Sequence, residues 1–211
     1  MEKKLSNGFK IGILGGAFNP PHRGHLLLAE KVLKKFNLNK IFFIPAGVPA
    51  LKKKELAPAK DRLEMTKLLI KGKPNFSVLD YEIRKKKKAY TLETVGYLKN
   101  KLKGAKIFWL IGEDSFREIV EGKWEKSRGL LDLAQFIIIT RTHHPYNLKT
   151  LPKKFKKKLE AALKKVVFLK LTLPVSATKI REKIKREEDV KDYLTKEVLG
   201  YIKRKRLYCD G

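Results

Sequence analysis

The sequence predicts an α/β fold, in which a doubly wound Rossmann-like parallel sheet carries flanking helices and a small helical C-terminal part. Short apolar segments alternate along the chain with longer segments of helical periodicity, the pattern of strand–helix–strand units. The apolar segments are almost continuous, which is typical of parallel strands buried on both faces. The 211 residues are 43% hydrophobic, enough for one core, so we expect a single domain over 1–211.

Each expected strand is a short run of aliphatic and aromatic residues bounded by glycine, proline or charge. In chain order the strands are Phe9–Leu14, Lys40–Ala46, Phe76–Asp80, Lys106–Gly112, Phe136–Thr140 and Val166–Lys170. Each expected helix has apolar residues on one side, and Pro58 and Ser176 suit a helix start. The helices are Gly24–Phe36, Pro58–Ile70, Thr91–Leu102, Pro152–Lys164, Ser176–Lys185 and Val190–Arg204. A basic loop over 47–57 follows the second strand.

The chain is strongly basic, with 50 Lys and Arg against 22 Asp and Glu and a net charge of +28. This balance favours a polyanionic partner, although scattered lysine runs more often form solvated surfaces. A basic nucleic-acid-binding protein, with strongly salt-dependent affinity, therefore stays open as an alternative. The lysine runs have no aromatic residues interleaved at the spacing that stacks successive bases. Lysine excess with few thermolabile residues also resembles a hyperthermophile composition.

Cellular location is constrained by two features. No apolar run approaches about 18 residues, and the first ten residues contain no apolar leader segment, so we expect neither a membrane span nor a secretory signal. The single cysteine, Cys209, cannot form an internal disulfide, which fits a reducing environment. We therefore expect a cytoplasmic protein.

The first strand leads directly into a turn suited to phosphate. Gly15 and Gly16 follow the strand, and glycine allows a tight turn and close approach of a ligand to the main chain. The helix that follows offers N–H groups and a favourable dipole to an anion. His22 and His25 are three residues apart, so both imidazoles should project from one face and donate hydrogen bonds to a polyphosphate. Half of a metal site, or two ordinary surface histidines, are the alternatives; no third metal ligand stands in register.

A second stretch, PVSATKIREKI, has the features of a capped helix with an arginine one turn in. Ser176 is a good N-cap and Thr178 lies in the first turn. Arg181 is three residues beyond Thr178, so hydroxyl and guanidinium should share a face and offer donors to phosphate oxygens. The stretch taken alone is equally typical of a helix with no ligand.

These two stretches resemble known motifs. GGAFNPPHRGH resembles the G-[TS]-F-[DN]-P-x-H-x-G-H signature of the nucleotidyltransferase superfamily, and VSATKIR resembles the I-S-x-T-x-I-R motif that closes the ATP site in its adenylyltransferases. Ala17 replaces the usual Thr or Ser, so a hydroxyl contact to phosphate at that position is missing. The resemblance implies His22, His25 and Arg181 as catalytic residues. The ATP-binding residues that it implies are Gly15, Gly16, Ala17, Phe18, His22, His25, Gly112, Asp114, Ser176, Thr178 and Arg181. Asp114 follows the fourth strand, where an acid can bind ribose hydroxyls, and a helix N-cap or first-turn acid is the alternative.

Over nearly its whole length the chain most resembles the bacterial nicotinate-nucleotide adenylyltransferases, on stretches such as IPAGVPALKK, DRLEMTKLLI, AYTLETV, WLIGEDSF and the tail YIKRKRLY. This implies that Tyr90 and Thr91 meet the pyridine carboxylate and that Trp124 covers the pyridine ring. An exposed loop tryptophan suits a flat cation, although it could also pack beneath its own loop. The family's usual loop histidine is absent, Leu51 standing near its place, and Lys52 remains to attract phosphate or carboxylate.

The resemblance implies an activity: joining ATP and nicotinate mononucleotide to give deamido-NAD and pyrophosphate. Nicotinamide mononucleotide and phosphopantetheine remain alternative acceptors. No activated nucleophile is evident, so direct transfer is expected, with Mg²⁺ arriving with ATP and no metal held by the protein. The expected partners are ATP and a pyridine mononucleotide, with no specific nucleic acid and no membrane, and a homo-oligomer stays open. The C-terminal helical part, about 174–208, is expected to complete the ATP site.

Overall fold

The computed structural model describes residues 8–48, 56–85, 90–124, 129–130, 133–140, 166–170 and 175–209. The chain forms two compact units. Unit 1 contains Met1–Leu14 and Tyr90–Thr172, and unit 2 contains Gly15–Ala89 and Leu173–Gly211. Each unit is thus built from segments that are distant in the sequence.

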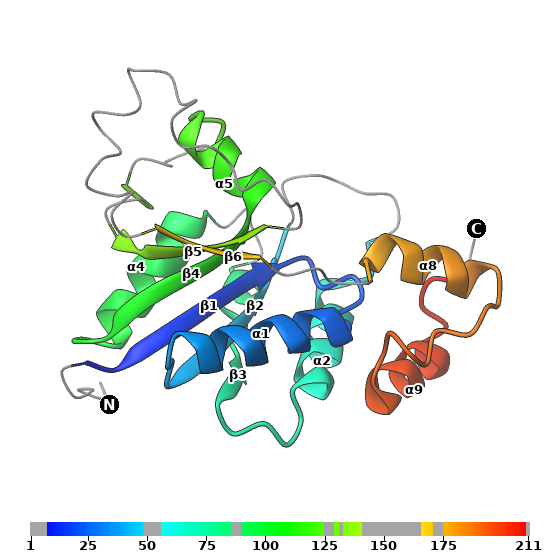
Figure 1. Cartoon of the computed structure of the whole chain (residues 1–211). Helices are drawn as coiled ribbons and strands as arrows, with labels where there is room; N and C mark the ends of the chain where they lie inside the picture. The colour runs from blue at the N-terminus through cyan, green and yellow to red at the C-terminus, as the bar shows by residue number, and fades with distance from the viewer. Residues whose placement is uncertain are drawn as a thin grey trace. The chain divides into compact units, whose positions relative to one another are not determined.

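The strands of the described chain form one six-stranded sheet in the order β3-β2-β1-β4-β5-β6 (Figure 1). The registered pairs β1–β4, β2–β3, β4–β5 and β5–β6 are all parallel. This order reverses beside β1, which is the doubly wound Rossmann-like arrangement that the alternating pattern predicts. The predicted fold class is therefore confirmed, and the end of β1 lies at the point where ligands bind in such sheets.

Unit 2 contains the elements that follow β1 and those that end the chain. They are α1 (Arg23–Lys35), β2 (Lys40–Pro45), α2 (Ala59–Leu69), β3 (Phe76–Val78), α3 (Tyr81–Arg84), α8 (Ala177–Lys185) and α9 (Lys196–Lys205). The core lies between the helices and strands, where Ala29, Val32, Ile41, Phe43 and Met65 are fully buried. α9 packs on α2, and the hydroxyl of Tyr201 donates to Asp61 Oδ1 over 2.7 Å.

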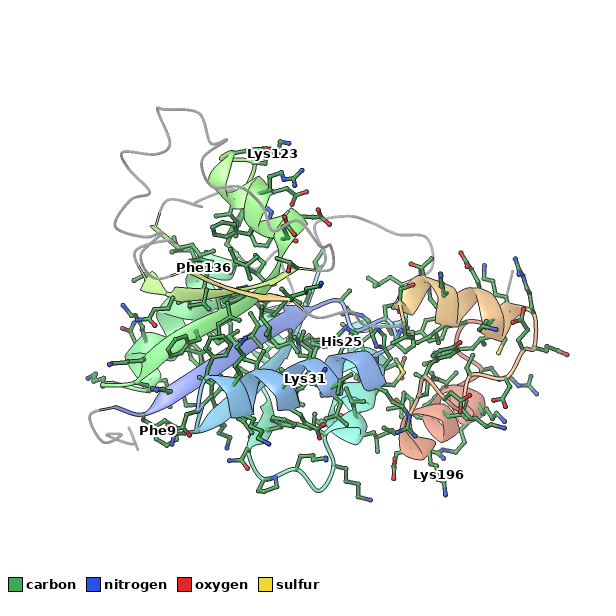
Figure 2. The ribbon with its side chains drawn as sticks, viewed as in Figure 1. Phe9, His25, Lys31, Lys123, Phe136 and Lys196 are labelled. Atoms are coloured by element: carbon green, nitrogen blue, oxygen red, sulfur yellow. The ribbon has the colours of Figure 1, made fainter. Side chains whose placement is uncertain are left out.

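Unit 1 contains most of β1 (Lys10–Gly16) and the helices and strands of its second segment. They are α4 (Thr91–Lys101), β4 (Lys106–Gly112), α5 (Glu113–Val120), β5 (Gln135–Thr140) and β6 (Val166–Lys170). In its core, Phe116 of α5 packs on Phe136 of β5 with ring centroids 5.7 Å apart. Figure 2 labels Phe136 among the buried side chains on this sheet. α5 begins where β4 ends, so the chain turns without a loop.

Most predicted elements agree with the structure within two residues, the usual uncertainty of element ends. The glycine pair belongs to β1 rather than following it, because Gly16 O accepts a hydrogen bond from Ala46 N and extends the strand. The strand predicted to Asp80 ends at Val78, and two helices, α3 and α5, were not predicted. The helix predicted over Pro152–Lys164 lies outside the described residues.

The last predicted helix is wrong at its start. It was expected from Val190, but α9 begins at Lys196, where Thr195 acts as N-cap and its hydroxyl accepts from Val198 N. The carbonyl oxygens of Tyr193 and Leu194 accept hydrogen bonds from Arg23 of α1 instead of from the following turn. A helix cannot extend through carbonyls that are engaged elsewhere, so a tertiary contact overrides the local pattern. In the described chain no helix is long and apolar enough to cross a membrane.

Candidate functional site

The turn between β1 and α1 has an unusual backbone. Phe18 adopts φ of +49°, a conformation that side-chain-bearing residues rarely occupy, and the Asn19–Pro20 peptide is cis. Gly16 has no such φ, and a Cβ there would meet the Phe18 ring at an ordinary 3.6 Å. The left-handed residue of the turn is therefore Phe18, and its ring lies at contact distance from the place that a side chain on Gly16 would take.

The two histidines of this turn stack on each other. His22 is the N-cap of α1 and is 5% exposed, while His25 lies half-buried in the first turn, where Figure 2 labels it. Their ring centroids are 3.8 Å apart, and the Phe18 ring lies 4.9 Å from that of His25. The backbone N–H of His22 donates to His25 Nδ1 over 3.2 Å. This assigns the proton of a neutral His25 to Nε2, the atom that would donate to a ligand.

Arg181 brings the second motif to the first. It lies in the second turn of α8, is only 6% exposed, and its Nη1 donates to the carbonyl oxygen of Asn19 over 2.9 Å. Asn19 precedes His22 by three residues, so guanidinium and imidazoles belong to one loop neighbourhood inside unit 2. The two predicted motifs, more than 150 residues apart in sequence, are therefore adjacent in space.

A glycine allows this close approach. A Cβ on Gly24 would lie 2.9 Å from Val175 Cγ1 and 2.9 Å from His22 Nδ1, closer than real contacts allow. Val175 is the residue before the N-cap of α8, so only a hydrogen at position 24 lets the start of α8 reach the start of α1 (Figure 1).

The predicted cap of α8 is present. Ser176 Oγ accepts from Lys179 N over 3.3 Å, so its hydroxyl serves the helix end as expected. Thr178 is exposed, whereas Arg181 is buried, so hydroxyl and guanidinium lie in different environments although they are one turn apart. Ala17 is also exposed, and Phe18 is buried.

Three residues without a predicted role prove central to this loop. The side-chain oxygen of Asn19 accepts from Ala57 N over 3.0 Å and from the Tyr208 hydroxyl over 2.8 Å. Burial is the main cause that raises the pKa of Tyr208. Arg62 of α2 is 1% exposed, and its bonds to other described residues all go to main-chain carbonyls, among them that of Ala17 at 2.8 Å. An arginine inside an apolar helical pattern was the available signal for Arg62. Asn19 lies inside the GGAFNPPHRGH motif and Tyr208 ends the stretch YIKRKRLY, so both stood in quoted stretches without an assigned role.

The other predicted site residues belong to unit 1. Gly112 is the exposed N-cap of α5, and Asp114 is an exposed acid in its first turn. Tyr90 caps α4 through its carbonyl oxygen, which accepts from Glu93 N over 2.9 Å, and Thr91 is the first residue of that helix. Trp124 is half-buried, and its Nε1–H donates to Glu118 Oε2 over 2.9 Å.

The described residues include neither the predicted anchor for the acceptor nor a cluster of metal ligands. Lys52, the predicted anchor for the acceptor, lies outside them. Within the described ranges no three His, Cys, Asp or Glu side chains gather as a metal site would require. The donors that the loop of unit 2 does offer are imidazole and guanidinium groups, which can donate hydrogen bonds to phosphate oxygens.

Comparisons with known proteins identify relatives of this chain. A model of the family described as Cytidylyltransferase-like matches residues 13–183, which span both motifs. A protein of Clostridium tetani named "Probable nicotinate-nucleotide adenylyltransferase" is 35% identical, covering 94% of this chain and 98% of its own. One from Dehalococcoides mccartyi with the same name is 36% identical over 94% and 97%.

Among solved structures, Plasmodium falciparum nicotinic acid mononucleotide adenylyltransferase complexed with NaAD superposes with a TM-score of 0.73. The alignment covers 95% of this chain and 97% of that one, at 20% identity. A second structure of the Plasmodium protein, complexed with APC, gives a TM-score of 0.70 at 19% identity. At such identity these likenesses establish the fold.

Proposed function

The chain belongs to the nicotinate-nucleotide adenylyltransferases, a group of Cytidylyltransferase-like enzymes, and from this we propose that it joins ATP and nicotinate mononucleotide into deamido-NAD and pyrophosphate. The reaction would serve NAD biosynthesis. The relatives supply the identity of the substrates, and the residues of this chain supply the means of binding them. A cytoplasmic location and a homo-oligomeric state are further, separate expectations.

One observation carries the proposal. Arg181 of α8 donates to the main-chain carbonyl of Asn19, in the loop that ends at the stacked pair His22 and His25. This contact gathers three nitrogen-rich side chains at the carboxyl end of β1. Such a group, beside the N-terminus of a helix, is suited to a polyphosphate.

The proposed chemistry is a direct in-line displacement at the α-phosphorus of ATP. An oxygen of the 5′-phosphate of nicotinate mononucleotide attacks that phosphorus, and a new P–O bond forms. The bond from the α-phosphorus to the oxygen bridging to the β-phosphate breaks, and pyrophosphate leaves with the electron pair. No enzyme-bound covalent intermediate is needed, so catalysis consists of positioning and electrostatic stabilisation.

We assign roles to the nucleotide-facing residues of unit 2. His25 Nε2–H, with His22 beside it, donates to phosphate oxygens as negative charge grows on them. Arg181 of α8 contributes a fixed positive charge beside that loop. Ser176 and Thr178 offer the first turn of α8, with the Thr178 hydroxyl exposed to a ligand. These donors are already held by caps and hydrogen bonds, so little reorganisation is needed during transfer.

The remaining roles belong to the pyridine nucleotide and the ribose. Tyr90 and Thr91 form the amino end of α4, where main-chain N–H groups and a hydroxyl suit a carboxylate. Trp124 would cover the pyridinium ring, with its Nε1–H held by Glu118. Asp114 would accept from ribose hydroxyls, and Lys52 would attract the acceptor.

A divalent cation, Mg²⁺, is part of the proposal as a companion of ATP. When bound, it neutralises phosphate charge and supports departure of pyrophosphate. In the described part of the chain the acidic groups are not gathered to cage a cation, so we assign it to phosphate oxygens of the nucleotide.

A pyrophosphate-release assay with three acceptors in parallel tests the reaction. Wild-type protein with ATP and Mg²⁺ should release pyrophosphate fastest with nicotinate mononucleotide, and more slowly with nicotinamide mononucleotide and phosphopantetheine. Turnover only with phosphopantetheine, or none with any acceptor, would contradict the proposal. The acid-to-amide ratio also measures the effect of replacing the family's loop histidine.

Substitution of His25 tests the assigned machinery. Removing one charged donor of this kind lowers turnover by about 10²–10³-fold. His25→Ala should therefore show that loss of kcat. Leu27→Ala, on an exposed face of the same helix, is the matched control and should keep the wild-type kcat. Near-normal turnover in His25→Ala would remove the imidazole from the mechanism.

A further inference from the structure

Arg62 is a buried cation that the mechanism above does not use. Its side chain is 1% exposed, and in the described part of the chain no carboxylate forms an ion pair with it. Burial is the main cause that lowers the pKa of Arg62, while the neighbouring Tyr208 opposes the shift. Burying a charge costs free energy that an apolar side chain at the same place would not incur. The position of this guanidinium therefore calls for a role other than stability.

Among the described residues, the guanidinium is held by main-chain carbonyl oxygens. Nε donates to Ala57 over 3.0 Å, Nη1 to Ala17 over 2.8 Å and Ala46 over 2.7 Å, and Nη2 to Gly47 over 3.1 Å. The four acceptors come from three stretches of chain: the turn after β1, the loop after β2 and the lead into α2. A rigid planar fork sets the directions of all these bonds together.

Two of these stretches are the ones on which the reaction depends. Ala17 precedes Phe18, whose ring packs against His25 at 4.9 Å. In the proposed function, the stretch after β2 that begins with Ala46 and Gly47 serves the acceptor. The two stretches also touch directly, because Ala46 N donates to Gly16 O over 2.9 Å.

The loop after β2 has little room to move on its other side. A Cβ on Gly47 would lie 2.2 Å from the carbonyl oxygen of Glu82, an atom of the main chain of α3. Gly47 is thus clamped between α3 and the Arg62 fork. A change in the Arg62 guanidinium should therefore change the spacing of the two loops, because Gly47 has no room to shift and compensate.

We propose that Arg62 is a positioning residue that sets the distance between two loops, so that the attacking phosphate and the α-phosphorus of ATP are aligned. The nucleotide loop is the turn after β1 that contains Ala17, and the acceptor loop begins after β2 at Ala46 and Gly47. The inference rests on the proposed function for the identity of the two substrates. ATP and the mononucleotide would each still bind when Arg62 is replaced. Alignment for in-line attack would fail, and misplacement of about 1 Å can cost roughly 10²-fold in rate.

Arg62→Lys separates this role from charge and from folding. Lysine keeps the positive charge but is a point donor that cannot hold three segments at fixed angles. We expect kcat to fall by about 10–10²-fold. The KM values for ATP and for nicotinate mononucleotide should stay within about threefold, and the stoichiometry of each binding reaction, measured by calorimetry with a non-hydrolysable ATP analogue, should remain near one per chain.

Thr66→Ala is the matched control. Thr66 lies one turn further along α2, is fully buried, and its hydroxyl donates to the carbonyl oxygen of Arg62 over 2.7 Å. Its loss should lower Tm and leave kcat unchanged. The positioning role would be refuted if the loss of rate in Arg62→Lys matched the fraction of chains that no longer bind the substrates in calorimetry. A kcat within threefold of the wild type would refute it as well.

A measurement on the wild type covers the case in which Arg62→Lys fails to fold. With arginine-selective labelling, the Nε–H and Nη–H resonances of Arg62 should shift on adding the ATP analogue and, separately, on adding nicotinate mononucleotide. Resonances insensitive to either ligand would overturn the inference. If the wild type turned over only with another mononucleotide, the proposed function would fail. Titrating the Arg62 resonances with that other mononucleotide would still decide the role of Arg62.

Discussion

Replacing Gly24 by alanine should lower both the stability and the kcat of the protein, because the new Cβ would clash with two neighbouring side chains. The new Cβ would lie 2.9 Å from Val175 Cγ1 and 2.9 Å from His22 Nδ1, where ordinary contacts begin at 3.4 Å, so each neighbour must move by about 0.5 Å. Overpacking of this kind costs about 1–3 kcal/mol. Because one of the displaced groups is the His22 imidazole, we also expect kcat to fall by roughly 10-fold.

Gly96→Ala provides the comparison that isolates this effect. Gly96 lies inside α4, and a Cβ there would meet nothing within 4 Å, so alanine should stabilise the helix by about 1 kcal/mol. Scanning calorimetry should place the Tm of Gly24→Ala below that of Gly96→Ala, by about 2–4 °C for each kcal/mol. A Gly24→Ala protein with wild-type kcat and a Tm equal to that of Gly96→Ala would refute the steric reasoning.

Three further outcomes are expected. Burial, and then the hydrogen bond to Asp61, raises the pKa of Tyr201 to about 12. The neutral phenol therefore stabilises the fold fully below pH 10, and this contribution is lost as the pH rises toward 12. The difference in Tm between wild type and Tyr201→Phe should shrink over that range. Tyr208→Phe removes the hydrogen bond to Asn19 and should lower the free energy of unfolding by about 1 kcal/mol in urea titrations, an unchanged midpoint being the contrary result. Trp124→Ala should raise the KM for nicotinate mononucleotide more than that for ATP in steady-state assays, and equal effects would remove the ring-covering role.

The sequence by itself determined the features that depend on neighbouring residues. Continuous apolar runs predicted buried parallel strands, which the sheet confirms. The glycine pair before two histidines predicted a phosphate-binding turn, and phosphate binding there stays a prediction. The serine cap of α8 was also predicted and is present at Ser176. These signals are local, because strand burial, helix capping and turn geometry each depend on residues within a few positions of one another.

Only the tertiary structure decided how distant groups share partners. The carbonyl of Asn19 accepts from Arg181, 162 positions away, and its side chain accepts from Tyr208, 189 positions away. The start of α9 was mispredicted for the same reason, since carbonyls before Thr195 serve Arg23 instead of the next helical turn. No periodicity or spacing encodes such pairings, because a buried donor finds its acceptor only after the chain has packed.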